Sequence, residues 1–456
     1  MRLSAATARH LPAGVVHPGY DRAAQRRGIV HIGIGAFARA HQAVYTDAAM
    51  AAGDRDWSIT GVSLRSASVA EALAPQDGLY TVTERGGDGE RVQLAGALRD
   101  VLVAPQNPSA VVAALADPDT RVVTLTVTEK AYQLGAGGAL DLAAVRASGE
   151  GLYHYLATGL AERRARGLPG LTLVSCDNLA ENGAKLGRAV AAWLDETDPS
   201  LARWFADCCA CPSTMVDRIV PAATAVMLDD AEARLGLRDA GAIVTEPFRQ
   251  WVIEDRFAGP RPRWEAGGAQ FAADVRPFET AKLRMLNGAH SALAYLGLAA
   301  GHAHVHEAIA DPVIRVTVEE LMRWEAAPTV DAAPGQDLTA YADALLARFA
   351  NPALPHRLAQ IATDGSQKIG PRWLAPLAIN RARGRRSPAT LIALAAWLRF
   401  VRAPADDPRS AALMACWRGG AQGVVDAVFG TRGLMPAAYA LDADDRAELT
   451  RLVRDD

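Results

Sequence analysis

The sequence predicts an α/β half followed by a mostly α-helical half, and two observations support this. A short apolar strand at residues 29–32 runs into a glycine-rich turn, and β-branched strands alternate with helical stretches along the first half. From Glu279 onward, Ala-rich helical patterns replace the strands. Strands alternating with helices are typical of a parallel sheet covered by helices. We therefore expect a boundary at Pro277, with an α/β domain at residues 1–277 and a helical domain at residues 278–456.

Composition narrows the possible partners. The chain has 456 residues, of which 50% are hydrophobic, enough for two or three domains with sizeable cores. The net charge is only −3 and no long block of like charge occurs, so we expect no nucleic-acid partner. The sequence has no apolar run of ~18 residues and no N-terminal apolar segment, so we expect no membrane association. A cytoplasmic monomer or small homo-oligomer fits this composition.

The five cysteines do not indicate a metal site. Three of them lie close together in Cys208-Cys209-Ala-Cys211, but there is no second CxxC pair and no neighbouring histidine. Zinc sites need about four such ligands at suitable spacing. We expect free thiols and no bound metal, which is consistent with a reducing compartment.

The first element is a dinucleotide fingerprint. The strand Ile29–Ile32 leads into Gly33-Ile-Gly35-Ala-Phe-Ala38, and a helical stretch follows through Met50. The first glycine allows the tight turn, the second lets the backbone approach a pyrophosphate, and the small Ala38 lets the helix pack on the strand. This context predicts a Rossmann-type domain that binds NAD or NADP.

The second strand, expected at residues 57–64, leaves the choice of cofactor open. An acidic residue at the end of this strand would bind the adenosine ribose of NAD, but the chain continues as Leu64-Arg65-Ser66-Ala67-Ser68. Arg65, Ser66 and Ser68 are suited instead to a 2′-phosphate. Both NAD and NADP therefore remain candidates.

Two further buried strands, at residues 121–128 and 171–176, end in polar residues. Glu129 and Lys130 follow the first strand, and Asp177 and Asn178 follow the second. Ligands of open α/β sheets bind at the carboxyl ends of strands, so we place these side chains near the working end of the cofactor. For Asn182 and Gly183, a little further on, ordinary turn chemistry is the favoured interpretation.

The remaining elements follow from periodicity and turn signals. We expect a helix at residues 184–207 and a strand with a polar end at Thr214–Pro221. Helices are expected in the second half at the following residues: 279–300, 311–326, 338–349, 388–402 and 409–427.

The helix that begins at Glu279 carries an unusual set of polar residues. At ~100° per residue, Glu279, Lys282, Asn287 and His290 share one arc of an otherwise apolar helix. Lys282 is one of only four lysines among 48 basic residues. A buried lysine can lose its proton and act as a base, whereas arginine stays charged. These observations favour a catalytic role for Lys282.

A second cluster of polar residues surrounds another of the four lysines. Lys368 lies in the string Gln360-Ile-Ala-Thr-Asp-Gly-Ser-Gln-Lys368, which reads as a Gly/Ser turn. Its amine is placed either to reach a substrate oxygen or to cap a helix. The two alternatives are equally compatible with the sequence.

Four motifs carry a resemblance to a known family: Gly33-Ile-Gly35-Ala-Phe37-Ala38-Arg39-Ala-His41-Gln42, Ser175-Cys-Asp177-Asn178, Met215-Val-Asp217-Arg218 and Lys282-x4-Asn287-x2-His290. The chain resembles the polyol-specific long-chain dehydrogenases, which include mannitol 2-dehydrogenases and fructuronate reductases (mannonate oxidoreductases). The resemblance spans about residues 28–380. It implies an active site between a Rossmann-type domain and a helical domain, with no zinc.

The resemblance also implies roles for individual residues. Lys282 corresponds to the general base, Asn178 and Asn287 to the pair that hydrogen-bonds the reacting oxygen, and His290 to a residue that orients the substrate. Glu279 resembles a carboxylate that helps to move the lysine proton. The resemblance further implies distal substrate contacts at Asp217 and Lys368, and Gln360 is a third candidate for a substrate contact. The candidate cofactor contacts are Gly33, Gly35, Phe37, Ala38, Arg39 and Glu129, together with Arg65, Ser66 and Ser68.

Two departures from the mannitol enzymes stand out, one at residues 67–68 and one at residue 360. Ala67 and Ser68 stand where those enzymes carry acidic residues, and Gln360 stands where they carry an arginine. The string around Gln360 is more similar to the uronate-reducing branch. We expect a polyol and its ketose, of the mannitol and fructose type, as substrates, with fructuronate and mannonate as the alternative. A non-catalytic NAD(P)-sensing protein is the alternative from another class.

Overall fold

The computed structural model describes residues 1–135 and 137–454. The chain forms two compact units, Met1–Val275 and Arg276–Asp456. The expected boundary residue Pro277 lies in α10 (Arg276–Ala281), the first helix of the second unit. Among the described residues, no helix combines the length and the apolar character needed to cross a membrane.

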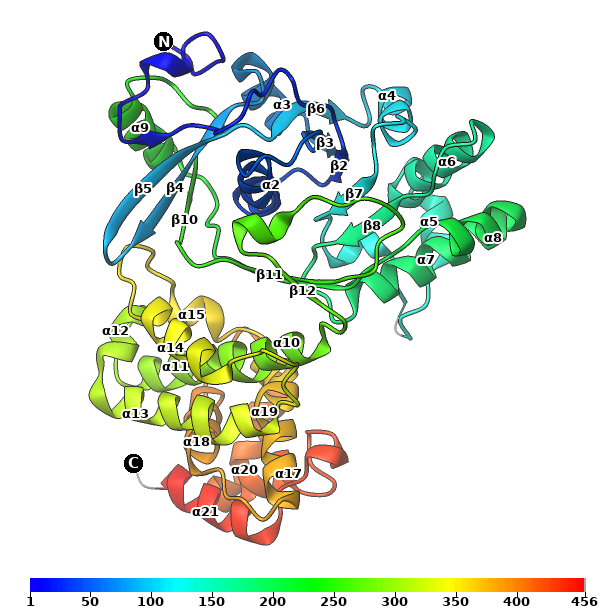
Figure 1. The fold of residues 1–456 in the computed structure, drawn as a ribbon. Helices are drawn as coiled ribbons and strands as arrows, with labels where there is room; N and C mark the ends of the chain where they lie inside the picture. The colour runs from blue at the N-terminus through cyan, green and yellow to red at the C-terminus, as the bar shows by residue number, and fades with distance from the viewer. Residues whose placement is uncertain (136, 455–456) are drawn as a thin grey trace. The chain divides into compact units, whose positions relative to one another are not determined.

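The first unit is built on a five-stranded sheet in which all neighbouring strands are parallel, in the order β6-β3-β2-β7-β8 (Figure 1). The strands are β2 (Ile29–Ile32), β3 (Ile59–Ser63), β6 (Leu98–Val103), β7 (Val122–Leu125) and β8 (Thr172–Ser175). Every residue of β2, β7 and β8 is buried, which explains why their sequences do not alternate between polar and apolar. The predicted Rossmann-type sheet is confirmed, with β3, β7 and β8 each shorter than expected.

The order of the strands locates the ligand-binding edge of this sheet. The chain runs from β2 to β3 and β6 on one side, and then continues with β7 and β8 on the other. The direction of winding thus reverses between β2 and β7. In open α/β sheets, ligands bind at this reversal, beyond the carboxyl ends of the strands.

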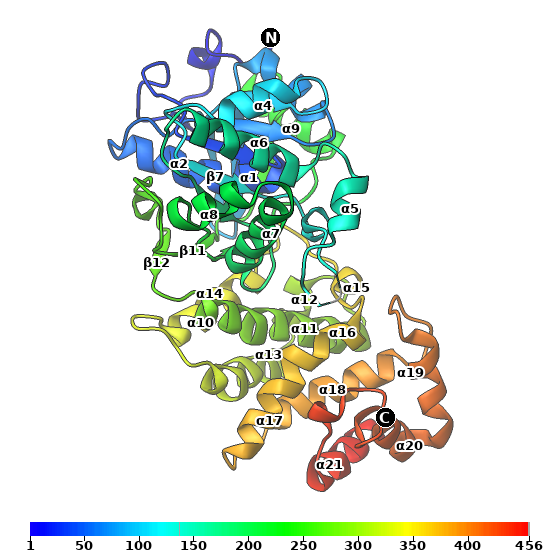
Figure 2. The same ribbon diagram turned by 90° about the vertical axis from the view of Figure 1, so that its right-hand side faces the viewer.

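Helices cover both faces of the sheet. One face packs against α1 (Ala36–Ala40) and α2 (Gln42–Ala51). The other packs against α4 (Pro108–Leu115), α6 (Leu152–Ala165), α7 (Asn182–Thr197) and α8 (Pro199–Cys208), which lie together in Figure 2. The unit also contains α3 (Ser68–Leu73), α5 (Leu142–Ala147) and α9 (Ala225–Leu235).

The prediction of a single helix at residues 184–207 was wrong. The chain breaks there into α7 and α8, because Pro199 cannot continue a helix and Asp198 caps the new one. The Asp198 carboxylate accepts hydrogen bonds from the amides of Ser200 at 2.9 Å and Leu201 at 3.0 Å.

Two smaller sheets in the first unit were not anticipated as sheets. One has the order β1-β5-β4-β10, and the other has the order β12-β11-β9. Their strands are β1 (Val15–Val16), β4 (Tyr80–Gly86), β5 (Gly89–Ala95), β9 (Thr214–Asp217), β10 (Ile243–Thr245), β11 (Gln250–Glu254) and β12 (Gln270–Ala272). β9 begins at the residue predicted for its strand but ends at Asp217, four residues early.

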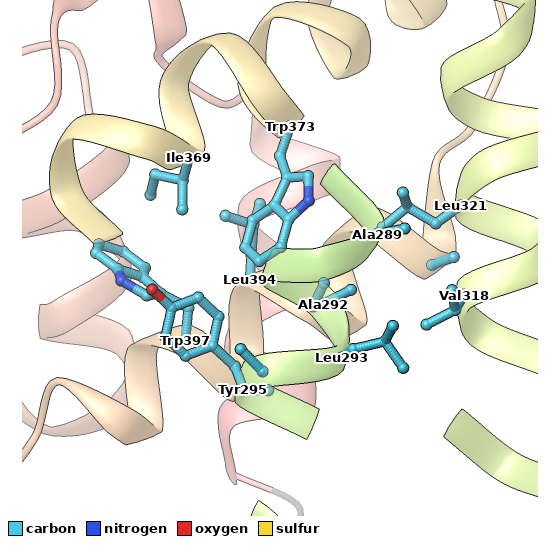
Figure 3. Close-up of a cluster of buried hydrophobic side chains, with 14 of the residues drawn as sticks. Ala289, Ala292, Leu293, Tyr295, Val318, Leu321, Ile369, Trp373, Leu394 and Trp397 are labelled. Atoms are coloured by element: carbon cyan, nitrogen blue, oxygen red, sulfur yellow. The ribbon is translucent and has the colours of Figure 1, made fainter. Parts of the chain in front are cut away.

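The second unit is helical, as predicted. Its central helix, α11 (Asn287–Ala299), packs on α18 (Pro388–Phe400), and Tyr295 points into a cluster with Trp373 and Trp397 (Figure 3). The other helices are α12 (Val305–Ala310), α13 (Pro312–Glu320), α14 (Leu338–Phe349), α15 (Leu358–Ile361), α16 (Gly365–Ile369), α17 (Ala375–Ala382), α19 (Ser410–Cys416), α20 (Gly420–Phe429) and α21 (Ala443–Arg454).

Some helices of this unit differ from the prediction. The stretch 409–427 is divided into α19 and α20 by the 3₁₀ turn Trp417–Gly419, and α20 begins at Gly420 with φ +66°. The stretches 279–300 and 311–326 are continuous but not α-helical throughout, because each contains a π-helical turn, Lys282–Leu286 and Leu321–Ala326. A third π-helical turn, Gly370–Leu374, follows α16.

Candidate active site

The conformation of the glycine turn after β2 requires glycine at the first position of the turn. Gly33 lies at φ +92°, and a Cβ atom there would sit 2.2 Å from the carbonyl oxygen of Thr126. The Gly33 amide donates to Val62 O at 2.8 Å, and the Gly35 amide donates to Gly33 O at 2.7 Å. The turn is therefore held against both neighbouring strands.

The backbone at Gly35, the second glycine of the turn, has few neighbours. A Cβ atom on Gly35 would meet only the Gly33 carbonyl oxygen, at 3.8 Å, so the backbone there is open to close approach. Helix α1 begins at the next residue, and the amides of its first turn have no carbonyl partner within the helix. An open glycine backbone next to a helix N-terminus is the arrangement that the dinucleotide fingerprint predicts.

Two residues of the glycine motif make inward contacts. Phe37 stacks on His41, with ring centroids 4.9 Å apart. Arg39 donates to Gly241 O at 2.7 Å and lies over the Tyr80 ring at 5.2 Å, and burial lowers the pKa of its guanidinium. Both side chains thus support the helix that follows the turn.

At the end of β3, the serines form a small hydrogen-bonded turn. Ser63 Oγ donates to Ser66 O at 2.5 Å, and Ser66 Oγ donates to Ser68 Oγ at 2.9 Å. Arg65, Ser66 and Ser68 are exposed. A basic side chain and two hydroxyls therefore stand where a ribose-binding carboxylate is absent.

The ends of β7 and β8 are joined by Asp177. Its carboxylate accepts hydrogen bonds from the amides of Val127 at 3.1 Å and Thr128 at 2.9 Å, and from the Tyr132 hydroxyl at 2.8 Å. Burial raises the pKa of Asp177, while these donors oppose the shift. Thr128 lies at φ +73°, a strained value for a β-branched residue, so Asp177 holds this segment in an unfavourable conformation.

The neighbouring polar residues are more open. Asn178 is exposed immediately after Asp177, and Glu129 is exposed in the short 3₁₀ turn Glu129–Tyr132. Asn178 stands on a well-fixed backbone, because Asp177 O accepts the Leu179 amide at 2.8 Å and the Asn182 side chain at 3.0 Å.

Asn182 does more than the ordinary turn chemistry expected of it. It is fully buried, and its amide nitrogen donates to Asp177 O and to Thr214 O at 2.9 Å. Its amide oxygen accepts from the Thr214 amide at 2.8 Å and from the Gly183 amide at 2.7 Å. Asn182 therefore connects the Asn178 turn to β9, which ends at Asp217. The turn signal in the sequence did not reveal this long-range link.

Beside Asp217 lies a buried arginine that sequence reasoning had noted only as part of a motif. The Arg218 side chain is fully buried and pairs with Glu84. It also donates to the carbonyls of Glu246 and Ala40, and the latter closes α1. Burial lowers the pKa of Arg218. Asp217, itself 8% exposed, is thus set on a strand anchored to the helix after the glycine turn.

In the second unit, Lys282 begins a π-helical turn, which corrects the angular prediction. The amide of Asn287 bonds to the carbonyl of Lys282, five residues earlier, rather than four as in an α-helix. At 100° per residue, Asn287 would fall about 140° from Lys282. The wider turn instead places it one turn above Lys282. Both residues are half-buried.

Neighbouring residues fix this segment. The Arg372 guanidinium donates to Ser291 Oγ at 2.7 Å and to Asn287 O at 3.3 Å. The Arg284 guanidinium donates to the Thr329 carbonyl at 2.5 Å. Glu279 lies in α10, one turn before Lys282, and is half-buried.

Two aromatic rings lie beside the His290 ring. Its ring lies 4.8 Å from the Phe349 ring and 5.6 Å from the His356 ring, the latter edge-on. Burial lowers the pKa of His356, which favours its neutral form beside His290. Neither contact was foreseen, because Phe349 and His356 are about sixty residues away in the sequence.

Lys368 makes the capping contact, one of its two predicted alternatives. Its amine donates to Thr363 O at 2.5 Å and approaches Ile361 O at 3.5 Å, at the end of α15. Burial, and then Arg372, lower its pKa. The expected Gly/Ser turn is in fact the helix α16. Gln360 is exposed on α15.

Comparison with known proteins places the whole chain in one family. Residues 27–266 match the mannitol dehydrogenase Rossmann domain, and residues 274–415 match the mannitol dehydrogenase C-terminal domain. The D-mannonate oxidoreductase of Escherichia coli is 41% identical over 401 residues, covering 85% of this chain and 82% of the relative.

Two solved structures share the fold along the full chain. A D-sorbitol dehydrogenase in substrate-free form superposes with a TM-score of 0.92 at 32% identity, covering 100% of this chain and 98% of the other. The mannitol 2-dehydrogenase of Pseudomonas fluorescens, in ternary complex with NAD and D-mannitol, gives 0.80 at 34% identity, covering 100% and 97%. The chain therefore belongs to the mannitol dehydrogenase family and is an oxidoreductase of the polyol dehydrogenase kind.

Proposed function

We propose that this protein is a zinc-independent, NAD(P)-dependent oxidoreductase that interconverts a sugar alcohol and its ketose, with Lys282 as the general base. The observation that carries the proposal is the π-helical turn, in which the Asn287 amide bonds to the Lys282 carbonyl and so sets Asn287 one turn after Lys282. A base and an amide donor one turn apart can hydrogen-bond to the same hydroxyl group. π-Helical turns of this kind occur frequently at functional sites.

In this proposal, the chain's own residues transfer the proton and stabilise the developing negative charge. The neutral Lys282 amine takes the hydroxyl proton, and Glu279, one turn earlier in the chain, carries that proton away. The side-chain amides of Asn178 and Asn287 donate to the alkoxide as it forms. The bound nicotinamide supplies the hydride acceptor.

The cofactor and the distal part of the substrate are assigned to further residues. Gly33 and Gly35 form the phosphate cradle, Phe37, Ala38 and Arg39 support it, and Glu129 lies at the edge of the cofactor site. His290 orients the substrate, with Asp217 and Gln360 as partners for its distal hydroxyls. Lys368 contributes by holding the end of α15, on which Gln360 stands.

A second substrate pair, mannonate and fructuronate, is favoured by two observations. The Escherichia coli relative that is 41% identical is a D-mannonate oxidoreductase. In addition, Gln360 stands where the resemblance to the mannitol enzymes implies an arginine. The reaction type and the catalytic residues would be the same for either pair.

A substrate panel tests the proposal. Reduced-cofactor absorbance is followed with mannitol, sorbitol, arabinitol and mannonate in the oxidative direction, and with fructose and fructuronate in the reductive direction, each with both cofactors. We expect turnover with at least one polyol–ketose pair, unaffected by EDTA. Turnover of mannonate and fructuronate alone would select the second pair, and inactivity towards the whole panel would refute both.

A further inference from the structure

A histidine in the centre of the parallel sheet has no role in the proposed chemistry. His31 stands between Val30 and Ile32 in β2 and is 1% exposed. Burying a polar ring costs free energy unless its nitrogen atoms are hydrogen-bonded, whereas a β-branched apolar residue fits a central strand at lower cost. The two ring nitrogens of His31 therefore need hydrogen-bond partners.

Both ring nitrogens of His31 have such partners on β7 and just beyond it. Nδ1 lies 2.7 Å from Thr124 Oγ1, and Nε2 lies 2.9 Å from Thr126 Oγ1. The Thr126 hydroxyl in turn donates to the carbonyl oxygen of Gly33 at 2.8 Å. The histidine is thus connected, through one hydroxyl, to the first glycine of the dinucleotide turn.

The direction of these hydrogen bonds defines the tautomer. A threonine hydroxyl has a single hydrogen, and that of Thr126 is used by Gly33 O, so Thr126 Oγ1 accepts from His31 Nε2–H. Nδ1 is then unprotonated and accepts from the Thr124 hydroxyl. Burial lowers the pKa of His31 to about 3, which keeps the ring neutral in this arrangement.

The Gly33 carbonyl is the point at which this chain of bonds acts on the turn. It accepts from the Thr126 hydroxyl and from the Gly35 amide, so two donors set the orientation of the peptide that follows Gly33. That peptide leads to the open backbone at Gly35, where a phosphate would approach. A small rotation of it would move the amides of the cradle.

The Thr126 side of the link is itself fixed. The next two amides, of Val127 and Thr128, donate to Asp177 at the end of β8. Thr126 is therefore held by its own strand on one side and by Asp177 on the other. The Thr126 hydroxyl is therefore a preorganised donor for the Gly33 carbonyl, because its position does not depend on the conformation of the glycine turn.

We propose that His31 and Thr126 are positioning residues for the dinucleotide: the neutral imidazole orients the Thr126 hydroxyl, which holds the Gly33 carbonyl and so keeps the glycine turn in its pyrophosphate-binding conformation. Neither side chain needs to touch the cofactor. This inference rests on the proposed use of NAD(P). It predicts an effect on cofactor affinity that is separate from the chemical step.

The experiment compares two threonines on either side of the same imidazole, the buried Thr124 and the half-buried Thr126. Thr126→Val removes the hydroxyl that holds Gly33, and Thr126→Ser retains it. Thr124→Val, the matched control, removes the hydrogen bond to Nδ1 but leaves the bond from Nε2 through Thr126 in place. For each full-length variant, the dissociation constants of NADH and NADPH are measured by titration, and kcat is measured at saturating cofactor.

We expect Thr126→Val to weaken binding of the preferred dinucleotide about tenfold, the effect of one lost hydrogen bond. Its kcat at saturation should stay within about twofold of the wild type, because the reacting groups are not changed. Thr126→Ser should restore the affinity to within about twofold. Thr124→Val should weaken binding less than about threefold.

A second pair of variants supports the test if Thr126→Val does not fold. His31→Gln places an amide near the position of Nε2, within reach of Thr126, whereas His31→Asn reaches only toward Thr124. Weaker binding in His31→Asn than in His31→Gln supports the proposal. Equal losses in Thr126→Val and Thr124→Val, or a loss confined to kcat, overturn it. If the wild type binds neither dinucleotide, the proposed function is refuted and this inference with it.

Discussion

The glycine turn of the first unit and the Lys282 segment of the second are two candidate functional elements with different origins. The turn is dictated locally: Gly33 has a positive φ and no room for a side chain, and both requirements can be read from Gly-x-Gly after a strand. The Lys282 segment is a helix in its sequence pattern, but its π-helical turn changes which side chains share a face. Backbone chemistry predicts the first element, whereas tertiary packing determines the second.

The largest expected effect separates the two glycines of the turn. Gly33→Ala should lower the free energy of unfolding by about 4 kcal/mol or more, because its Cβ would overlap Thr126 O and its φ is positive. Gly35→Ala should fold normally and weaken cofactor binding instead, because its Cβ would enter open space. Urea unfolding and NADH titration of both variants measure the difference. Equal stability of the two variants would contradict a locally dictated turn.

The next effect concerns the amide donors, one from each unit. Asn287→Ala and Asn178→Ala should each raise the activation barrier by about 3–4 kcal/mol, because each removes a donor to the developing alkoxide. Stability should change little, and alanine favours the helix at residue 287. Steady-state kcat at saturating substrate measures the effect. Less than a tenfold loss in Asn287→Ala would remove the functional significance of the π-helical turn.

A third prediction compares two asparagines in the same turn. Asn182→Asp should cost about 3 kcal/mol of stability, because a buried carboxylate would face the carbonyls of Asp177 and Thr214 in place of two donated hydrogen bonds. Asn178→Asp, at an exposed position, should leave stability nearly unchanged while lowering activity. Denaturant unfolding combined with kcat distinguishes the roles. Similar stability losses would show that Asn182 is an ordinary turn residue.

The smallest effect is a pH dependence arising from His31. Its pKa is about 3 in the folded protein and about 6.5 when unfolded. The unfolded chain therefore binds an extra proton between these values, and the stability present above pH 6.5 is lost as the pH falls toward 3. The loss should approach ~1.4 kcal/mol per pH unit below pH 6. Urea unfolding of the wild type and of His31→Gln, at pH 6.5, 5.5 and 4.5, should diverge by this slope. Parallel curves would show that the ring takes up its proton as readily in the folded chain as in the unfolded chain.

Much of the architecture could be predicted because its signals are local. Buried parallel strands such as Ile29–Ile32 are apolar throughout, and the change to Ala-rich helices near Pro277 is visible in composition. The break at Pro199 was missed although its cause, proline after a capping aspartate, was present in the sequence. The helical patterns on both sides of Pro199 are strong enough to predict one continuous helix despite the proline.

The site was predictable only in part. The π-helical turn after Lys282 has no sequence signal, because Leu, Arg and Met are ordinary α-helix formers. The buried links made by Asn182 and His31 depend on threonines 32 and 95 residues away. Polar residues that satisfy one another over such distances cannot be paired from one sequence by periodicity. Position along a strand indicated the functional edge, but not which side chain faces the ligand and which holds the backbone.

Lys282→Ala tests the central claim most directly, with single-turnover rates and cofactor dissociation constants measured on the same protein. Lys185→Ala, a half-buried lysine on α7, serves as the control. We predict that Lys282→Ala binds the cofactor within about threefold of the wild type and loses more than about a thousandfold in rate, because the hydroxyl proton has no acceptor. Retention of a tenth of the wild-type rate would contradict the assignment of Lys282 as the base.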